Sequence, residues 1–306
     1  MVTYIARRLL MLIPVLIGVS FFVFLIAKVT PGDPVLLMLG KRATPDKIAA
    51  LREQLHLNDP FFIQYGRFLW NSLHGDLGKT NKGQIPVLKE ITDRFPSTLQ
   101  LTLAATLFAS SVGIPIGVLA ARNRGKLADG LLMSFSFVGV SIPSFWLAIL
   151  LILLFGVTLR WVSVAGGTGL KDTILPAFVL GLAPTAVLAR MTRACMLEVL
   201  NEDYVRTARA KGLMERLVIQ KHVLRNALIP VVTYLGLMFA DLLAGALFIE
   251  NVFARPGWGR LMVTAISDRD FPVIQGMVLF TATGYVLLNL VVDILYGVID
   301  PRIGLS

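Results

Sequence analysis

Residues 9–27 read LLMLIPVLIGVSFFVFLIA, a run of 19 positions without a charged side chain. A bilayer core about 30 Å thick needs about 20 apolar residues at a rise of 1.5 Å each. The run is therefore long enough to cross a membrane as one helix. Arg7 and Arg8 precede it and Lys28 follows it, with no small-residue cleavage site, so we expect a retained first span and not a removed signal peptide.

The composition of the whole chain agrees with a membrane location. Apolar residues make up 56% of the 306 positions and charged residues only 16%. A soluble domain carries about a quarter charged residues, so this chain lacks the polar surface that water demands and must face lipid. The single cysteine, Cys195, excludes an internal disulfide and a multi-cysteine metal site, and we expect a packing role for it.

Six stretches of the sequence reach the length of a membrane span. They cover residues 9–27, 99–121, 131–159, 174–189, 227–249 and 273–298. We expect helices, because a spanning segment must satisfy its backbone groups internally and these runs lack the alternation of barrel strands. Pro115, Pro143 and Pro184 lie inside the stretches and predict kinks. Gly113 and Gly117 form a G-x-x-x-G pattern, which predicts close helix packing.

The distribution of lysine and arginine predicts the orientation of these spans. If the N-terminus is cytoplasmic, 14 basic residues lie on the cytoplasmic side and 5 in the two short outer loops, while the long outer segment counts little. The cytoplasmic set is Arg7, Arg8, Arg122, Arg124, Lys126, Arg190, Arg193, Arg206, Arg209, Lys211, Arg216, Lys221, Arg225 and Arg302. The outer set is Arg160, Lys171, Arg255, Arg260 and Arg269. We therefore expect both termini in the cytoplasm, and the net charge of +10 needs no nucleic acid to explain it.

The chain divides into four expected regions. These are the N-terminal tail with the first span (1–28), an extracytoplasmic helical segment (29–97), a membrane core of five spans (98–298) with a cytoplasmic loop at 190–225, and a cytoplasmic tail (299–306). In the outer segment, Thr44 and Pro45 predict a helix start, and residues 61–73 form an amphipathic run. Ser97 and Gln100 form a capping-box pattern where the second span begins. We expect a small helical cap, which is compatible with docking of an outside partner.

A short glycine-lysine-threonine sequence at Gly78, Lys79 and Thr80 is similar to the end of a phosphate-binding loop. That motif needs a glycine five residues earlier, where this chain has Leu73, and a preceding strand. The stretch also lies on the expected outer side, where ATP is not available. We therefore expect no nucleotide site and no ATP hydrolysis in this chain.

No catalytic or metal-binding constellation is evident. His56, His74 and His222 are far apart in the sequence, and no serine lies in a Gly-x-Ser-x-Gly elbow. Asp241 lies deep in the fifth span, where an ionised aspartate costs roughly 2.5–3.5 kcal/mol, so it is a candidate for lining a polar pathway or for a helix–helix hydrogen bond. Glu250, at the outer end of that span, is a second pathway candidate that could meet a cationic group on a substrate.

The cytoplasmic loop carries the most specific pattern. Its centre, from Glu202 to Gly212, reads EDYVRTARAKG. Acids at the start and bases later complement a helix dipole, and Gly212 can end a helix, so we expect a short helix between two spans. Its residues form the candidate docking site: Glu202, Asp203, Tyr204, Arg206, Thr207, Ala208, Arg209, Ala210, Lys211 and Gly212. The residues alone leave open whether this is a docking helix or an ordinary basic loop.

This loop, together with residues 224–230, resembles the coupling loop of ABC importer permeases, most closely the dipeptide, oligopeptide and nickel branch. Further stretches that match the branch are 31–34, 74–78, 190–193, 255–260, 269–272 and 300–302. The general ABC pattern begins Glu-Ala-Ala, where this chain has Arg206, Thr207 and Ala208, a departure that the peptide branch shares. The resemblance covers nearly the whole chain.

The resemblance implies a type I ABC importer permease in the bacterial cytoplasmic (inner) membrane. Its partners would be a second homologous permease, two ABC ATPase subunits that hold ATP and magnesium, an extracytoplasmic solute-binding protein and membrane lipid. The chain itself would carry no cofactor, no metal and no enzymatic activity. The implied cargo is dipeptides or oligopeptides, with nickel, opines, glutathione and related solutes left open.

Two other function classes are alternatives to this one. A stand-alone carrier or channel driven by a gradient often has inverted repeats and ion sites at mid-membrane, whereas this sequence shows no repeat and one deep aspartate. A membrane enzyme would need a convergent catalytic set. An active lone chain would favour the carrier, and co-purifying ATPases would favour the importer.

Overall fold

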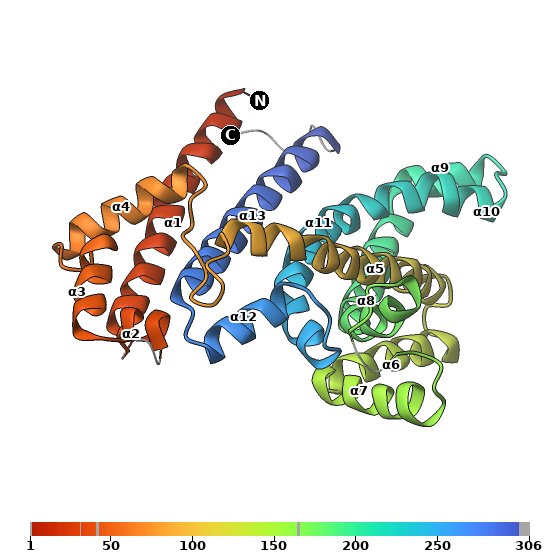
Figure 1. The fold of residues 1–306 in the computed structure, drawn as a ribbon. Coiled ribbons are helices and arrows are strands. Elements are labelled where there is room, and N and C mark those ends of the chain that lie inside the picture. The colour runs from red at the N-terminus through yellow and green to blue at the C-terminus, as the bar shows by residue number, and fades with distance from the viewer. Residues whose placement is uncertain (1, 31, 41–42, 164–165, 300–306) are drawn as a thin grey trace. The chain divides into compact units, whose positions relative to one another are not determined.

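The computed structural model of the chain describes residues 2–30, 32–40, 43–163 and 166–299. Helices dominate these ranges, and the one β-type pairing in them is an isolated bridge between Lys79 and Pro86. Figure 1 labels the α-helices, and two further segments, η2 and η3, are π-helical. In chain order the elements are α1 (Val2–Val29), α2 (Pro34–Leu39), α3 (Pro45–Gln54), α4 (Phe61–Leu73), α5 (Val87–Arg122), α6 (Leu127–Ser141), α7 (Ser144–Leu151), η2 (Ile152–Thr158), α8 (Leu170–Leu200), α9 (Asp203–Ala210), α10 (Glu215–Leu217), η3 (Val218–Leu224), α11 (Arg225–Val252), α12 (Trp258–Ser267) and α13 (Phe271–Ile299). Pro31 and residues 300–302, from two stretches that match the peptide branch, lie outside the described residues.

Among the residues that the structure describes, five helical segments are long and apolar enough to cross a membrane. They are Leu10–Val29, Val87–Arg122, Leu170–Leu200, Glu215–Val252 and Phe271–Val292. A sixth crossing is possible only if the bent pair Leu127–Ser141 and Ser144–Thr158 counts as one span. The all-helical membrane fold expected from the sequence is therefore confirmed, whereas the count of six spans and their orientation stay predictions.

The third expected span, residues 131–159, is not one straight helix. Its two halves meet at 91°. Ile142 is extended (φ −96°, ψ 124°), as the residue before a proline tends to be, and Pro143 has no N–H to continue the first half. The second half starts anew, with Leu147 N donating to Pro143 O at 3.0 Å. The kink predicted at Pro143 is confirmed and is sharper than a bend within one helix.

The capping-box prediction at Ser97 and Gln100 is wrong. Helix α5 begins at Val87 and continues through Ser97, so that Ser97 lies inside the helix and the expected boundary at residue 97 falls within it. Val87 and Ile91 are fully buried, so tertiary packing stabilises this added part of the helix.

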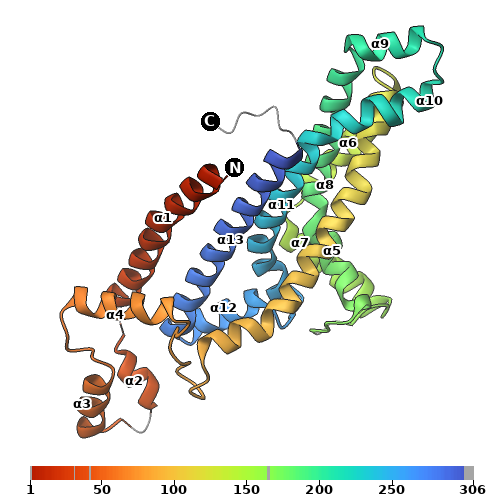
Figure 2. The ribbon, with the colours of Figure 1, turned by 90° about the horizontal axis from the view of Figure 1, so that it is seen from above.

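The contacts of the chain cluster into two compact units. Unit 1 consists of the residues up to Pro96 together with Gly257–Leu287, and unit 2 of Ser97–Pro256 together with the residues from Leu288 onward. In unit 1, α4 crosses the C-terminal end of α1, as Figure 2 shows. The expected outer helices are present as α2, α3 and α4. Thr44 occupies the predicted N-cap position of α3, without a capping hydrogen bond from its side chain within the described residues.

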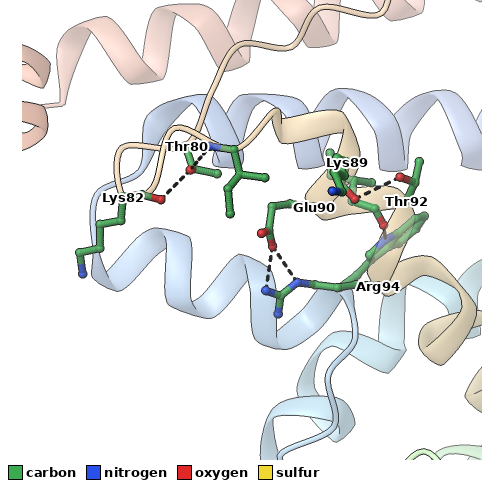
Figure 3. Close-up of polar contacts among 9 residues, drawn as sticks. Thr80, Lys82, Lys89, Glu90, Thr92 and Arg94 are labelled. Carbon is green, nitrogen blue, oxygen red and sulfur yellow. Dashed lines mark hydrogen bonds and ion pairs between the residues drawn. The ribbon is translucent and has the colours of Figure 1, made fainter.

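The loop before α5 is anchored within unit 1. Asn81 N donates to Asp270 Oδ2 at 2.8 Å, and Lys82 pairs with Asp268 at 2.7 Å. Burial raises the pKa of Asp270 above its ordinary value, because the ionised carboxylate loses water there. Figure 3 shows this loop, in which the Thr80 hydroxyl donates to Lys82 O at 2.7 Å. The hydroxyl is thus already hydrogen-bonded in a turn, an arrangement unlike the strand–loop–helix setting of a phosphate-binding loop.

The beginning of α5 carries its own ion pair, also shown in Figure 3. Arg94 donates to Glu90 Oε2 through Nε at 3.1 Å and through Nη2 at 2.8 Å, one helical turn apart. Trp258 of α12 donates its Nε1–H to Ile91 O at 2.9 Å and stacks on Phe95 at 4.9 Å between ring centroids. These contacts explain why residues 87–96 are helical.

Unit 2 is built around α8, which packs against α5, α6, α7 and α11. The close packing predicted from G-x-x-x-G is confirmed. A Cβ at Gly113 would lie 2.7 Å from Thr185 O, and one at Gly117 would lie 2.5 Å from Ala189 O. Only glycine lets the α5 and α8 backbones approach this closely. The resulting bundle fixes the helix ends on which α9 rests.

Candidate functional site

The candidate docking helix α9 forms where the sequence predicts it. Helix α8 ends at Leu200, Glu202 takes the N-cap position of α9, and Asp203 lies in the first turn with Arg209 in the last. This charge order complements the helix dipole. The prediction of a short helix between two long ones is therefore confirmed.

The inner face of α9 is apolar and buried. Val205 has no exposed surface and Ala208 is 6% exposed. Both belong to one cluster with residues from the adjoining ends of α5, α8, η3 and α11: Ala121, Met196, Val218, Ile219, Val223 and Ala227. The inner face of α9 therefore packs into this apolar cluster at the ends of several long helices. We call the cluster residues outside α9 the apolar seat. A displacement of α9 must move these helix ends, because packed interiors transmit strain.

The outer face of α9 is polar and accessible. Of the ten residues predicted as the docking site, only Ala208 is buried, and the other nine are exposed. The Arg206 side chain is 71% exposed and pairs with the also exposed Asp203 at 3.7 Å. A surface of this kind offers charges and hydrogen-bonding groups to another protein.

Glycine at position 212 closes the helix. Gly212 has φ +77°, the left-handed conformation that L side chains rarely adopt. Gly212 N donates to Arg209 O at 2.9 Å and Leu213 N to Ala208 O at 3.4 Å. This pair of bonds is the Schellman arrangement, which satisfies the last carbonyls of a helix. The predicted stop at Gly212 is confirmed.

Arg209 links α9 to the next helix. Its Nε donates to Glu215 Oε2 at 3.0 Å and its Nη2 to Oε1 at 2.7 Å, a two-bond pair across the turn. The hydrogen bond to this carboxylate raises the pKa of Arg209 above its ordinary value, so the guanidinium stays charged. Arg209 thus holds the loop together, whereas Arg206 remains available to a partner.

A groove of about 700 Å³, lined by both polar and apolar side chains, lies beside α9. Its polar lining consists of Tyr204 from α9 and of Lys221, His222, Arg225 and Asn226, and its apolar lining of Leu228, Ile229 and Val232. Asn226 Nδ2 donates to Tyr204 Oη at 2.9 Å and to His222 O at 3.1 Å, so the groove wall is tied to the helix. The π-helical segment η3 leads into this wall, and such segments often occur at functional sites.

A second ion pair fixes the adjoining loop to α8. Arg193 donates to both carboxylate oxygens of Asp129, each at 2.7 Å, and Gly125 N donates to Asp129 Oδ2 at 3.1 Å. The Arg190 guanidinium lies over the Phe137 ring at 4.9 Å. The matched stretch 190–193 therefore anchors α6 to α8.

The two pathway candidates have different surroundings. Asp241 lies on an exposed face of α11, within the predicted fifth span. Glu250 has no exposed surface. Nearby, Arg255 is 1% exposed and donates to Gly167 O and Thr173 Oγ1, each at 3.1 Å, which holds the chain before α8. Roles for Asp241 and Glu250 in a substrate pathway stay predictions.

The predicted site omitted several partner residues. Glu215 and Asn226 complete the contacts of Arg209 and Tyr204, and Asp129 completes those of Arg193. One signal was present in the sequence, because Glu215 is the only acidic residue between Arg206 and Arg225. No sequence pattern pairs Asp129 with Arg193, which lies 64 positions away.

Comparison with known proteins covers the whole chain. The family model described as "Binding-protein-dependent transport system inner membrane component" matches residues 113–305, and the model for the N-terminal part of such membrane components matches residues 1–102. The chain is 44% identical over 335 aligned positions to the dipeptide transport system permease protein DppB of Escherichia coli K12. It is 46% identical over 332 positions to the di/tripeptide transport system permease protein DppB of Pseudomonas aeruginosa UCBPP-PA14. In both cases 99% of each chain is covered.

Solved structures share the fold at much lower identity. A chain of the MetNI methionine ABC transporter in an inward-facing conformation matches with a TM-score of 0.57 and 18% identity, over 69% of this chain and 96% of the other. An amino acid ABC transporter solved with histidines gives 0.52 and 16%, over 70% and 94%. These matches show the fold alone. With the two family models and the full-length relatives, they establish that this multi-pass membrane chain belongs to the family of binding-protein-dependent transport system inner membrane components, the permease subunits of ABC importers.

Proposed function

We propose that this chain is one of two permease subunits through which an ATP-driven importer takes up dipeptides or short oligopeptides. Two ABC ATPases bind its cytoplasmic side, where they hold ATP and magnesium, and a solute-binding protein delivers the peptide on the other side. Both termini are cytoplasmic, and six spans include the bent pair α6 and α7–η2. The second permease subunit is a homologue of this chain.

Similarity to the peptide permeases supports the substrate class. The two relatives described above, whose names give dipeptides and di- or tripeptides as their cargo, align over 99% of this chain. The stretch from Glu202 to Gly212 lies within the region matched by the main family model. Peptides are therefore a better-supported cargo than nickel, opines or glutathione.

The observation that carries the mechanism is the two-sided character of α9. Arg206, Thr207 and Lys211 are exposed on its outer side, while Val205 and Ala208 are buried in the apolar seat. When the ATPases close around ATP, they displace α9. The seat passes this displacement to the ends of α5, α8 and α11, which changes the access of the pathway.

The free energy of such a conformational change sets a requirement on how firmly α9 is attached to the long helices. Shifting a two-state equilibrium from 1:99 to 99:1 takes about 5.5 kcal/mol of differential binding. The connection must stay intact under a load of this size. The buried residues Val205 and Ala208 hold α9 in its seat, while the Schellman bonds at Gly212 and the Arg209–Glu215 pair order the end of the helix.

The experiment is uptake of a radiolabelled dipeptide by proteoliposomes that hold the assembled importer, its binding protein and enclosed ATP. Arg206→Glu reverses the charge on the exposed face of α9. We expect it to lower uptake at least tenfold and to reduce co-purification of the ATPases, with unchanged insertion of the permease. Lys126→Glu is the matched control, because Lys126 is an exposed cation elsewhere in the cytoplasmic loops. It should keep uptake within about twofold.

Two outcomes would overturn the proposal. One is wild-type uptake by the Arg206→Glu importer. The other is dipeptide transport by this chain alone, without ATPases, which would instead identify a gradient-driven carrier.

A further inference from the structure

Helix α4 has three distinct faces around its axis. At about 100° per residue, Phe61, Tyr65 and Phe68 fall on one side. Phe62, Trp70 and Leu73 fall on the next part of the circumference, with Ile63 at its edge. Gln64, Arg67 and Asn71 form the remaining, polar part. The apolar arc is thus continuous and covers more than half of the helix.

The first of these faces packs against α1. Phe61 contacts Phe21 and Phe24 of α1 with ring centroids 6.0 and 5.4 Å apart, and Tyr65 contacts the same two rings at 5.4 and 5.6 Å. The Tyr65 hydroxyl lies 2.9 Å from Ser20 Oγ, within hydrogen-bonding distance. Helix α4 is therefore fixed against a membrane span.

The second face is left bare. Phe62 is 76% exposed, Leu73 74%, Trp70 64% and Ile63 53%. Four large apolar side chains on one helix face are unusual on a surface that only water covers, and such patches mark a contact with a partner or a membrane. We define this face, Phe62, Ile63, Trp70 and Leu73, as the bare face of α4.

The bare face continues the lipid-facing surface of α1. Phe22 of α1 is 64% exposed on a segment that is long and apolar enough to cross the bilayer. Four rings form a series of contacts between the two helices. The ring centroids lie 6.4 Å apart for Phe22 and Phe21, 6.0 Å for Phe21 and Phe61, and 5.4 Å for Phe61 and Phe62. One apolar surface therefore extends from the span onto the bare face.

The depth of this contact agrees with the boundary of a bilayer. The span in α1 ends at Val29, and Phe24 and Phe21 lie five and eight residues before that end. At a rise of about 1.5 Å per residue they lie about 8 and 12 Å along the helix from it. Interfacial helices bury their apolar side about 5–10 Å into the membrane boundary, and tryptophan is enriched there. The contact at Phe24 falls within this depth, and the contact at Phe21 lies about one residue rise deeper.

The polar arc faces a different environment. Gln64, Arg67 and Asn71 line an open cavity of about 1,140 Å³ together with Lys28 and Arg52. Arg67 pairs with Asp59 at 3.0 Å. Helix α4 thus directs its polar side chains to an open cavity and carries large apolar side chains on another side, the amphipathic arrangement of a helix that lies in a membrane surface.

We propose that α4 lies in the membrane–water interface with its bare face inserted in lipid, at the C-terminal end of α1. The phospholipid bilayer, and not another protein, covers Phe62, Ile63, Trp70 and Leu73. The helix serves as an anchor that holds the segment between α1 and α5 at the membrane surface. This inference depends on the membrane location of α1 and not on the transported substrate.

The test measures which molecules collide with each face of α4. The full-length chain, with Cys195→Ala to remove the native thiol, is reconstituted in liposomes of phosphatidylethanolamine and phosphatidylglycerol. Single cysteines replace Phe62, Ile63, Trp70 or Leu73 in turn and carry a nitroxide spin label. Asn71→Cys, on the polar arc of the same helix, is the matched control. Electron paramagnetic resonance then compares collisions with oxygen, which partitions into lipid, and with a water-soluble nickel chelate.

We expect the ratio of oxygen to nickel collisions to be at least fivefold higher on the bare face than at residue 71. High nickel accessibility on the bare face would mean that water covers it and would overturn the proposal. Low accessibility to both reagents would mean that protein covers it, such as a second copy in the liposome, and would overturn the proposal equally. The four positions give independent readings, so one variant that fails to insert leaves the test intact. Dipeptide uptake plays no part in the readout, so the proposed function and this inference can fail separately.

Discussion

Arg209 and Glu215 face each other across the turn that ends α9, joined by two hydrogen bonds of 3.0 and 2.7 Å. The pair closes the turn from Lys211 to Met214 against α10. Because both side chains are about half exposed, water screens their attraction. The pair therefore orders the turn locally and contributes little to the stability of the whole chain.

Breaking this pair should loosen the turn without unfolding the protein. An exposed ion pair contributes about 0–1 kcal/mol, so Glu215→Gln should lower hydrogen-exchange protection of the amides around Gly212 by up to about fivefold and leave the long helices unchanged. Peptide-resolved hydrogen exchange of the reconstituted chain measures this. The charge-swapped double variant Arg209→Glu with Glu215→Arg should regain part of the protection. Equal protection in wild type and Glu215→Gln would contradict the assigned role of the pair.

The loss of transport caused by substituting Gly212 should depend on the backbone conformation that the new residue can adopt and not on the space for its side chain. A Cβ at this position meets nothing within 4 Å, but φ is +77°. The left-handed conformation costs an L residue about 1–2 kcal/mol, and asparagine tolerates it best. In the uptake assay, Gly212→Val should therefore lose several-fold more activity than Gly212→Asn, at equal membrane levels. Equal loss in the two variants would show that the terminating turn does not matter.

The Asp129–Arg193 pair should contribute strongly to the stability of unit 2. Asp129 is 6% exposed, and its removal leaves a guanidinium that is mostly buried and unpaired. Breaking buried pairs costs about 3–5 kcal/mol, and the partial exposure of Arg193 reduces this to about 2–3. Asp129→Ala should lower the thermal midpoint of the detergent-solubilised chain by about 4–10 °C. Asp203→Asn, at a side chain that is 98% exposed, is the control and should leave the midpoint unchanged. A change below 1 °C for Asp129→Ala would contradict the prediction.

Gly117 should tolerate no side chain. Its Cβ would lie 2.5 Å from Ala189 O and 2.6 Å from Thr192 Cβ, so α5 and α8 would have to separate. Overpacking in a rigid core costs about 1–3 kcal/mol or more, and a leucine here should prevent stable insertion. Gly18→Ala is the matched control, because a Cβ at Gly18 meets nothing within 4 Å in its membrane helix. The amount of monodisperse protein after detergent extraction distinguishes the two variants, and equal yields would disprove the close approach.

Acid should weaken the segment around α2 and α3. The hydrogen bond from Arg52, aided by capping of Val35 N at 2.9 Å, holds the pKa of Asp33 below its ordinary value. Because the folded value is lowered, the stabilisation is fully present above the ordinary carboxyl pKa of about 3.9 and is lost as the pH falls through the lowered value. The loss is modest, about 0–1 kcal/mol, since Arg52 is half exposed.

Hydrogen exchange of residues 34–54, expressed as protection factors between pH 5 and pH 2.5, follows this loss. In Asp33→Asn the protection of the segment should be lower at pH 5 and nearly independent of pH. Protection of the wild-type segment that does not change across this range would contradict the prediction.

Much of the fold could be predicted from short stretches of the sequence. Span-length apolar runs predict the long helices, because lipid admits only backbones that are hydrogen-bonded within the segment. The C-terminal end of α9 was also predictable from the local sequence, since Gly212 readily adopts a left-handed conformation that other residues avoid. The G-x-x-x-G pattern correctly identified the face of α5 that meets α8, since small residues permit close approach.

Other features depended on contacts between distant residues. The capping-box pattern at Ser97 predicted a helix start, but buried Ile91 and the Trp258 hydrogen bond to its carbonyl stabilise a helix that begins at Val87. Pro143 predicted a kink, but the local sequence around it does not determine the angle of 91° between α6 and the helix that follows. Tertiary packing overrides the local preference at Ser97, whereas at Pro143 the local chemistry breaks the helix but does not set the angle.

By itself, the sequence determined that this protein is helical, that it belongs in a membrane and that a short charged helix ends at Gly212. These properties follow from hydropathy and backbone preferences, which act over a few turns of chain. Only the tertiary structure decided that Val205 and Ala208 seat that helix, that Asp129 meets Arg193 and that α4 leaves Phe62 and Trp70 bare. Such partners are set by how long helices pack, because the free energy of a contact depends on what surrounds it and not on how near its members lie in the chain.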